Sequence, residues 1–207
     1  MRTRIKICGI TRTEDAIACV RLGADALGFI FWRPSARHID PAAAREVIRH
    51  AGPFVATVGV FVNPDRAEVV NAINVSGISM LQFHGEEQPQ FCSSFGRPFI
   101  KAFKAEKGCD LLKSTLGFEG AAAWLFDSHD EQLVGGTGRR FDWERIPAQL
   151  TRPFVLSGGL DCGNVSEGIR RMRPHAVDVS SGVESSKGIK DAVKVAAFIQ
   201  GVHDAGS

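Results

Sequence analysis

The sequence lacks several features that would each assign it to a particular class of protein. Its formal net charge is only +2 over 207 residues, so charge gives no sign of a nucleic-acid partner. No apolar run reaches the length of a membrane span, and the apolar run in the amino-terminal MRTRIKICGI is too short for a signal peptide. We therefore expect a cytoplasmic protein with neither a membrane nor a nucleic-acid partner.

Motifs for metals, disulfides and nucleotides are also missing. The cysteines are odd in number and include no C-x-x-C pair, which argues against a disulfide framework and a thiolate metal site: Cys8, Cys19, Cys92, Cys109 and Cys162. The six histidines form no H-x-x-x-H or H-E-x-x-H group, and there is no G-x-G-x-x-G or Walker motif. We expect no metal and no cofactor.

What the sequence does contain is a regular alternation of short apolar runs and longer helical patterns. Several runs, such as ALGFIF and TVGVFV, lack polar alternation, which predicts strands buried on both faces, as in a parallel sheet under helices. The predicted strands are Arg4–Ile10, Ala26–Phe31, Thr57–Val62, Met80–His84, Phe99–Lys104, Ala123–Asp127, Phe154–Ser157 and Ala176–Val179.

The segments between these strands carry helix start and stop signals. Gly23 ends a helix that begins near Thr13, and Asn164 can cap a helix over Val165–Met172. Asp40 precedes Pro41 and a helix over 42–50, and Asn63 precedes Pro64 and a helix over 65–74. A last helical pattern, from Gly188 to about Val202, places one apolar stripe on Ile189, Val193, Ala196, Ala197 and Ile199.

Eight strands separated by helices imply right-handed parallel crossovers. Eight such units over residues 1–207 most simply close into one domain, an α/β protein with a (β/α)8 (TIM) barrel, although roughly 250 residues are typical of that fold. A doubly wound open sheet is the alternative, and periodicity alone does not exclude it.

Polar residues recur at the carboxyl ends of the predicted strands, where barrels of this kind carry their chemistry. The residues at or just after these ends are Cys8, Arg37, Asn63, His84 and Asp127. Each placement alone is unremarkable, but their recurrence on one rim indicates an active site.

Three glycine-rich loops predict a phosphate site. They are Gly135-Gly136-Thr137-Gly138, Ser157-Gly158-Gly159 and Ser180-Ser181-Gly182. Glycines let the backbone approach an anion, and the last two loops follow strands seven and eight, where such barrels often hold phosphate. Any single loop could instead be a tight turn.

The remaining candidates each have two interpretations. Cys8 is either an inert core thiol, as we expect for the other four cysteines, or a general base whose pKa a positive field lowers. Asp127 ends an apolar strand, where burial would raise its pKa and suit a general acid, but it could equally cap a turn. Arg37 could form a bidentate pair with a carboxylate, or it could be a surface residue. Asp178 could make a polar contact inside the barrel, or it could bind a hydroxyl group of the substrate.

These segments together resemble phosphoribosylanthranilate isomerase, a family of tryptophan biosynthesis. The similar motifs run in the family's order from Lys6 to Asp191: KICGIT, GFIFWRPSARHI, VGVFVN, LQFHGEE, LFDS, GGTGRRFDW, LSGGL and VDVSSGVESSKGIKD. The departures are mild: Ala36, Phe83 and Glu86 replace residues more common in the family.

The resemblance implies a (β/α)8 barrel that catalyses a cofactor-independent Amadori rearrangement of a small phosphorylated substrate. By motif, Cys8 would be the general base, Asp127 the general acid, and Arg37 the ligand of the anthranilate carboxylate. Asp178 and His84 would contact the substrate, and the phosphate would bind around Gly136, Gly158, Gly159, Ser180 and Ser181. The protein would be a monomer or a homodimer.

Two enzyme alternatives and one non-enzyme alternative stay open. An indole-glycerol-phosphate synthase would need further catalytic lysine and glutamate residues, and a pentose-phosphate epimerase would need metal ligands. A catalytically silent binder of phosphorylated ligands is the third alternative, because fold does not fix function. A related aminoaldose phosphate is a further possible substrate.

Overall fold

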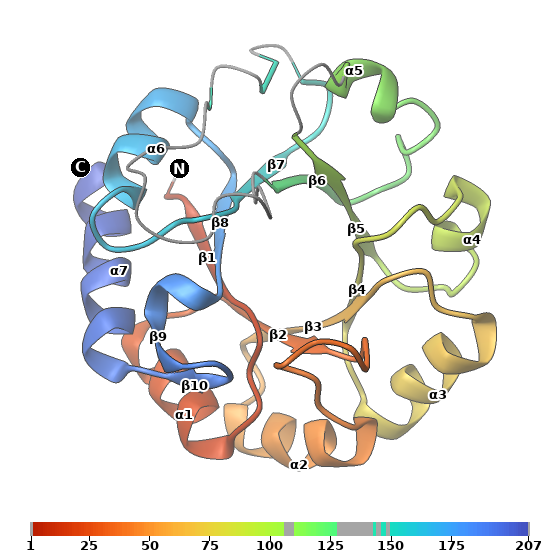
Figure 1. Ribbon diagram of the computed structural model, residues 1–207, viewed down its shortest axis with the longest axis horizontal. Coiled ribbons are helices and arrows are strands. Elements are labelled where there is room, and N and C mark those ends of the chain that lie inside the picture. Colours follow the sequence, from red (N-terminus) through yellow and green to blue (C-terminus); the bar gives the residue numbers. More distant parts are fainter. Residues whose placement is uncertain (1, 106–109, 128–142, 144–145, 148–149, 207) are drawn as a thin grey trace.

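The described residues fold into a closed barrel of parallel strands surrounded by helices (Figure 1). A computed structural model describes residues 2–105, 110–127, 143, 146–147 and 150–206. The strands follow each other around the barrel in chain order, and β1 closes the ring by pairing with β8. This confirms the predicted barrel and excludes the open sheet.

The strands of the barrel match the apolar runs of the sequence closely. They are β1 (Arg4–Ile7), β2 (Ala26–Ile30), β3 (Ala56–Phe61), β4 (Met80–Phe83), β5 (Phe99–Lys104), β6 (Ala123–Asp127), β7 (Phe154–Ser157) and β8 (Ala176–Val179). The largest difference is in β1, which we expected to continue to Ile10. It ends earlier because Gly9 has a φ of 75°, a left-handed conformation that interrupts an extended strand.

The helices are α1 (Thr13–Leu22), α2 (Pro41–Ala51), α3 (Arg66–Ser76), α4 (Pro89–Ser93), α5 (Leu111–Ser114), α6 (Val165–Met172) and α7 (Ala192–Ala205). The helix predicted over 65–74 begins later, because its cap is Asp65 rather than Asn63. The Asp65 side chain accepts from the backbone of Glu68, whose side chain accepts from Asp65 N–H in a capping box.

The predicted apolar stripe of the last helix is wrong except at Ile199, which is buried. Ile189 lies before the helix, and Val193 is 78% exposed. The helix begins at Ala192, after the N-cap Asp191, and its buried residues are Val195, Phe198, Ile199 and Val202. The predicted stripe began at Ile189, which belongs to β10, whereas the face that packs against the barrel has the i, i+3, i+4, i+7 spacing of Val195, Phe198, Ile199 and Val202.

Two apolar cores lie on the two sides of the barrel wall. The larger core fills the space between strands and helices and includes Phe29, Phe83, Phe126 and Phe198. The smaller core fills the inside of the barrel with Ile100, Ala102, Ala123, Leu125, Val155 and Ala176. The barrel is therefore a packed body, and polar chemistry is confined to its ends.

A small structure that we did not predict follows β8. It consists of a 3-10 helix (Ser181–Val183) and a hairpin of β9 (Glu184–Ser186) and β10 (Ile189–Lys190). In Figure 1 this hairpin lies beside α1 and α7, at the edge of the barrel. Among the helices of the described residues, none has both the length and the apolar character needed to cross a membrane.

Candidate active site

Cys8 and Asp127 lie at the same end of the barrel. Cys8 directly follows β1, and Asp127 is the last residue of β6. All strands are parallel, so both residues belong to the carboxyl-terminal rim. In the closed strand order β7 and β8 separate β6 from β1, which places the two residues across the barrel mouth from each other.

Cys8 shares the barrel interior with a buried ion pair. Lys6 Nζ lies 2.9 Å from Asp178 Oδ1, and the side chains of both residues are almost fully buried. Gly28 on β2 makes room for this group, since a Cβ atom there would come within 2.7 Å of Cys8 Sγ and 3.0 Å of Lys6 Nζ. Asp178 therefore makes an interior polar contact, as one of its two interpretations expected, and its contact with the substrate stays a prediction.

Burial dominates the electrostatics of the Cys8 thiol. Removal from water raises the pKa of Cys8, and the nearby Asp178 carboxylate adds to this, whereas the Lys6 and Lys190 ammonium groups lower it. The net pKa is raised, so the positive field only partly offsets burial, which differs from the lowered pKa that we expected. Burial lowers the pKa of Lys6, but Asp178 and Cys8 outweigh that effect and the net pKa is raised.

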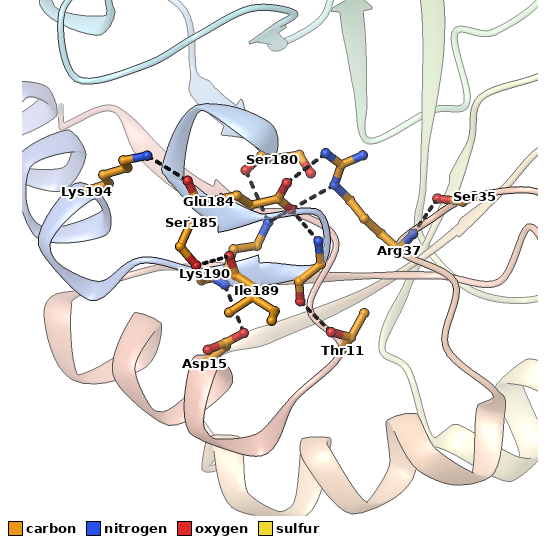
Figure 2. Close-up of polar contacts among 11 residues, drawn as sticks. Thr11, Asp15, Ser35, Arg37, Ser180, Glu184, Ser185, Ile189, Lys190 and Lys194 are labelled. Carbon is orange, nitrogen blue, oxygen red and sulfur yellow. Dashed lines mark hydrogen bonds and ion pairs between the residues drawn. The ribbon is translucent and has the colours of Figure 1, made fainter.

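Arg37 lies in the loop after β2 and forms a bidentate ion pair with Glu184 (Figure 2). Arg37 Nε is 2.8 Å from Glu184 Oε1, and Nη2 is 2.7 Å from Oε2. Lys190 Nζ donates to the same Oε1 at 2.8 Å. Burial by itself raises the pKa of Glu184, but hydrogen bonds from Arg37 and Lys190 outweigh burial and lower it. Arg37 is thus an anchored residue and not a free surface arginine.

The turn after Cys8 packs directly against Arg37 and Ser180. A Cβ atom on Gly9 would lie 2.6 Å from Arg37 Cδ and 3.0 Å from Ser180 Oγ. Glycine at this position therefore allows the loop after β2 and the loop after β8 to meet beside the thiol.

On the other side of the mouth, Asp127 pairs with His84. His84 Nε2 is 3.0 Å from Asp127 Oδ2, and Gln82 Nε2 is 3.2 Å from His84 Nδ1. The Asp127 side chain is 20% exposed. Its surroundings are therefore more polar than the apolar sequence before it suggested. The structure also gives His84 a protein partner, where we expected only substrate.

Two of the three loops predicted to hold phosphate are described. Gly158 and Gly159 follow β7 with φ values of 89° and 62°, and Ser180 and Ser181 follow β8. A Cβ atom on Gly159 would meet nothing within 4 Å, so this turn is open on that side. Gly136 and its loop lie outside the described residues.

Sequence reasoning missed four residues of this rim: Lys6, Gln82, Glu184 and Lys190. Lys6 could have been found, because Lys6 and Cys8 are two residues apart and so share the inward side of a strand. Glu184 and Lys190 gave no such signal, because the apolar pattern around them predicts the start of a helix rather than a hairpin.

Some other expectations are settled by burial. Cys19 and Cys92 are buried as expected, Cys162 is exposed and was wrongly assigned to the core, and Cys109 lies outside the described residues.

Asn63 contacts the loop after β4 by accepting from Glu86 N–H at 2.7 Å. Within the described ranges no three His, Cys, Asp or Glu side chains could hold a metal ion, and a metal-free reaction stays a prediction.

Comparison with known proteins agrees with this geometry over nearly the whole chain. Residues 5–201 match the family model of N-(5'-phosphoribosyl)anthranilate isomerase. The isomerase of Nitrosospira multiformis is 52% identical over 98% of this chain and 97% of its own length. That of Pseudomonas paraeruginosa is 47% identical over 98% of this chain and 96% of its own.

Solved structures give the same result. The isomerase from Thermotoga maritima superposes with a TM-score of 0.86 at 38% identity, covering 98% of this chain and 99% of the other. A phosphoribosyl anthranilate isomerase in complex with reduced 1-(o-carboxyphenylamino)-1-deoxyribulose 5-phosphate has a TM-score of 0.84 at 36% identity, with the same coverage. The chain therefore belongs to the N-(5'-phosphoribosyl)anthranilate isomerase family.

Proposed function

We propose that Cys8 and Asp127 act as general base and general acid in the isomerisation of N-(5'-phosphoribosyl)anthranilate, the activity of this family. The product is 1-(o-carboxyphenylamino)-1-deoxyribulose 5-phosphate. The observation that carries the proposal is the placement of a thiol and a carboxyl group on opposite sides of one barrel mouth. A substrate between them can receive a proton from one and lose a proton to the other.

The two proposed groups carry out the first two proton transfers of the reaction. Asp127 donates its proton to the furanose ring oxygen, the bond from that oxygen to C1′ breaks, and an iminium forms between C1′ and the anthranilate nitrogen. Cys8, as thiolate, then removes the proton from C2′. The resulting enolamine takes up a proton at C1′ and loses the proton of its C2′ hydroxyl to solvent, which gives the C2′ ketone.

His84 supports the acid step. Gln82 donates to His84 Nδ1, so the neutral ring carries its proton on Nε2 and donates it to Asp127. This hydrogen bond stabilises the carboxylate that Asp127 becomes after it has given its proton to the ring oxygen.

The charged ends of the substrate fit the remaining rim residues. The phosphate binds at the turns after β7 and β8, around Gly158, Gly159, Ser180 and Ser181, with Gly136 as the expected third contact. The Ser180 hydroxyl supports this, because it is buried and no described residue gives it a hydrogen-bond partner. The anthranilate carboxylate binds Arg37, whose Nη1 is the guanidinium nitrogen that Glu184 does not engage.

The test is the turnover of purified variants. Cys8→Ser and Asp127→Asn should each lose about 10²- to 10⁴-fold in kcat, because each removes one proton-transfer group while keeping its size. Substrate loss can be followed by the fluorescence of the anthranilate group. Binding of the reduced product analogue should persist in both variants.

Matched controls are Cys162→Ser and Asp204→Asn, which change the same residue types at exposed positions. Asp204 lies in α7, and Cys162 lies in the loop between β7 and α6, where no contact with substrate is assigned to it. Both should turn over like the parent. Near-parental kcat in Cys8→Ser or Asp127→Asn would refute the role assigned to that residue.

Assembly and location remain predictions. A relative from Thermotoga maritima is described as dimeric and has also been made monomeric, and we propose that this chain is a monomer or a homodimer. A cytoplasmic location stays a prediction from the sequence alone.

A further inference from the structure

We propose that Lys6 is a positioning residue whose ammonium group, anchored by Asp178, stabilises the thiolate form of Cys8. The inference rests on the proposed function, in which Cys8 is the base, and extends it by naming what makes the base available. It depends on three neighbours in space: a lysine on β1, an aspartate on β8 and the sulfur that follows β1.

The two strands hold the lysine and the aspartate in register. Lys6 on β1 pairs directly with Asp178 on β8, although the two lie 172 positions apart in the chain. Their side chains are 5% and 7% exposed and meet at 2.9 Å. The ammonium group is therefore held in place and cannot turn away into solvent.

The ammonium group and the sulfur converge over one glycine. A single Cβ atom on Gly28 would lie 2.7 Å from Cys8 Sγ and 3.0 Å from Lys6 Nζ. The Lys6 charge favours the thiolate form of Cys8 and so acts to lower the pKa of that thiol. Any larger residue at position 28 would occupy the space in which these groups meet.

A buried ion pair needs a reason other than stability. Replacing such a pair with apolar residues of similar volume often leaves a protein equally stable or makes it more stable. The inside of this barrel is otherwise filled by apolar side chains at its lower levels. A charged pair directly beside the thiol is explained if its field acts on the sulfur.

Four charged groups act on the thiol, and they differ in sign. Lys6 on β1, Lys190 on β10 and Arg37 in the loop after β2 are positive, whereas Asp178 on β8 is negative. After burial, which raises the pKa of Cys8, Lys6 has the largest effect and lowers it. Asp178 raises the pKa by a smaller amount. Removing Lys6 and removing Asp178 should therefore change the thiol in opposite directions.

The experiment measures the rate at which iodoacetamide alkylates Cys8 as a function of pH, followed by mass spectrometry of the Cys8 peptide. The thiolate is the reactive form, so the pH midpoint reports the pKa independently of how accessible the thiol is. Exposed Cys162 in the same sample is the internal reference. The readout does not require turnover.

Lys6→Met should shift the Cys8 midpoint upward by about one pH unit, so alkylation near pH 7.5 becomes about tenfold slower. Lys6→Arg keeps the charge and should restore most of the rate. Asp178→Asn should make alkylation faster than in the parent. If the pair had a purely structural role, Cys8 alkylation would not become faster in Asp178→Asn and slower in Lys6→Met.

Lys6→Met leaves a buried carboxylate without its partner and can fail to fold. Lys6→Met combined with Asp178→Asn removes both charges and keeps the proposal falsifiable. Its midpoint should still lie above that of the parent, because Lys6 has the larger effect. Circular dichroism and thermal unfolding check that each variant is folded.

The role of Lys6 would be overturned if the pH midpoint of Cys8 alkylation were unchanged in the folded double variant. It would also be overturned if Cys8 were alkylated more slowly in Asp178→Asn than in the parent. If that occurs while Cys8→Ser is inactive, the proposed function stands and this inference falls. If Cys8→Ser keeps full turnover while the midpoints shift as expected, the electrostatic coupling stands and the role of Cys8 as base falls.

Discussion

At the scale of single residues, the acid side of the site depends on a chain of three side chains. Gln82 is 1% exposed, and its amide contacts His84, which in turn contacts Asp127. The chain runs from two partly exposed side chains at the mouth to a buried amide in the barrel wall. A buried amide can fix the orientation of an imidazole more firmly than solvent can.

Replacing Gln82 tests this arrangement. Gln82→Leu has similar volume but cannot donate to His84 Nδ1, so His84 is free to rotate or to change tautomer. We expect kcat to fall about tenfold, less than the roughly 10²- to 10⁴-fold loss of a whole proton-transfer group because Asp127 itself is kept, with KM changed much less. Steady-state kinetics across pH 6–9 would measure both.

Gln88→Leu is the matched control, since Gln88 lies outside the site and its side chain does not cap α4. It should leave both constants near parental values. Parental kcat in Gln82→Leu at every pH would show that His84 does not depend on this contact.

At the scale of elements, the small hairpin after β8 anchors the loop after β2. Glu184 at the start of β9 receives Arg37 from that loop and Lys190 from β10, and Lys194 Nζ of α7 donates to the Glu184 backbone oxygen at 2.7 Å (Figure 2). Lys190 N–H donates to Asp15 of α1 at 3.0 Å. The hairpin thereby ties α1, α7 and the Arg37 loop together.

Glu184→Gln should loosen Arg37 without removing it. A glutamine accepts at only one oxygen, so the bidentate pair becomes a single neutral bond and loses its fixed geometry. We expect KM to rise about tenfold and kcat to change less, because Arg37 contributes to binding of the carboxylate and not to proton transfer. Glu14→Gln, at an exposed position of α1, is the control. A parental KM in Glu184→Gln would contradict the proposed role of Arg37 in binding the anthranilate carboxylate.

At the scale of the whole molecule, the ring of strands is tied together at its amino-terminal end by Asp25. Its carboxylate accepts from Arg2 at 2.6 Å, from Arg4 at 3.0 Å and from the backbone of Ile5 at 2.9 Å. These contacts join the residue before β2 to β1. Burial alone would raise the pKa of Asp25, but the bonds from Arg2, Ile5 and Arg4 outweigh it and lower the pKa.

This lowered pKa predicts a pH-dependent contribution to stability. A carboxylate with a lower pKa in the folded state stabilises the fold above its unfolded pKa of about 3.9, and the stabilisation is lost as the pH falls through the folded value. Asp25→Asn should lower the free energy of unfolding by about 1–2 kcal/mol at pH 7. The expected value is small because Arg2 and Arg4 are exposed, and solvent weakens their ion pairs with Asp25.

Urea unfolding of parent and Asp25→Asn at pH 7, pH 5 and pH 3.5 measures this difference. It should be the same at pH 7 and pH 5 and should shrink at pH 3.5. Asp204→Asn is the control. A difference that stays constant down to pH 3.5 would show that the charge of Asp25 does not stabilise the fold.

Local sequence determined most of the elements of this barrel. Strands with both faces buried are mainly apolar, so β5 to β8 could be placed with the bounds that the structure has, although β5 contains Lys101 and Lys104 and β8 contains Asp178. Gly23 ends α1 in a left-handed conformation, as expected of a helix stop. The sequence was less reliable where two signals overlap, as between Gly188 and Ala192, where a short strand and a helix start share one apolar pattern.

Cys8, His84 and Asp127 were likewise predictable one at a time, because each lies at the end of a strand that could be recognised. Their partners were decided only by the tertiary structure. Arg37 and Glu184 are 147 positions apart, and Lys6 and Asp178 are 172 apart. No local pattern relates such positions. The closure of the barrel brings β8 beside β1, and this contact places the Asp178 carboxylate against the Lys6 ammonium group. The segment that follows β8 places the Glu184 carboxylate against Arg37.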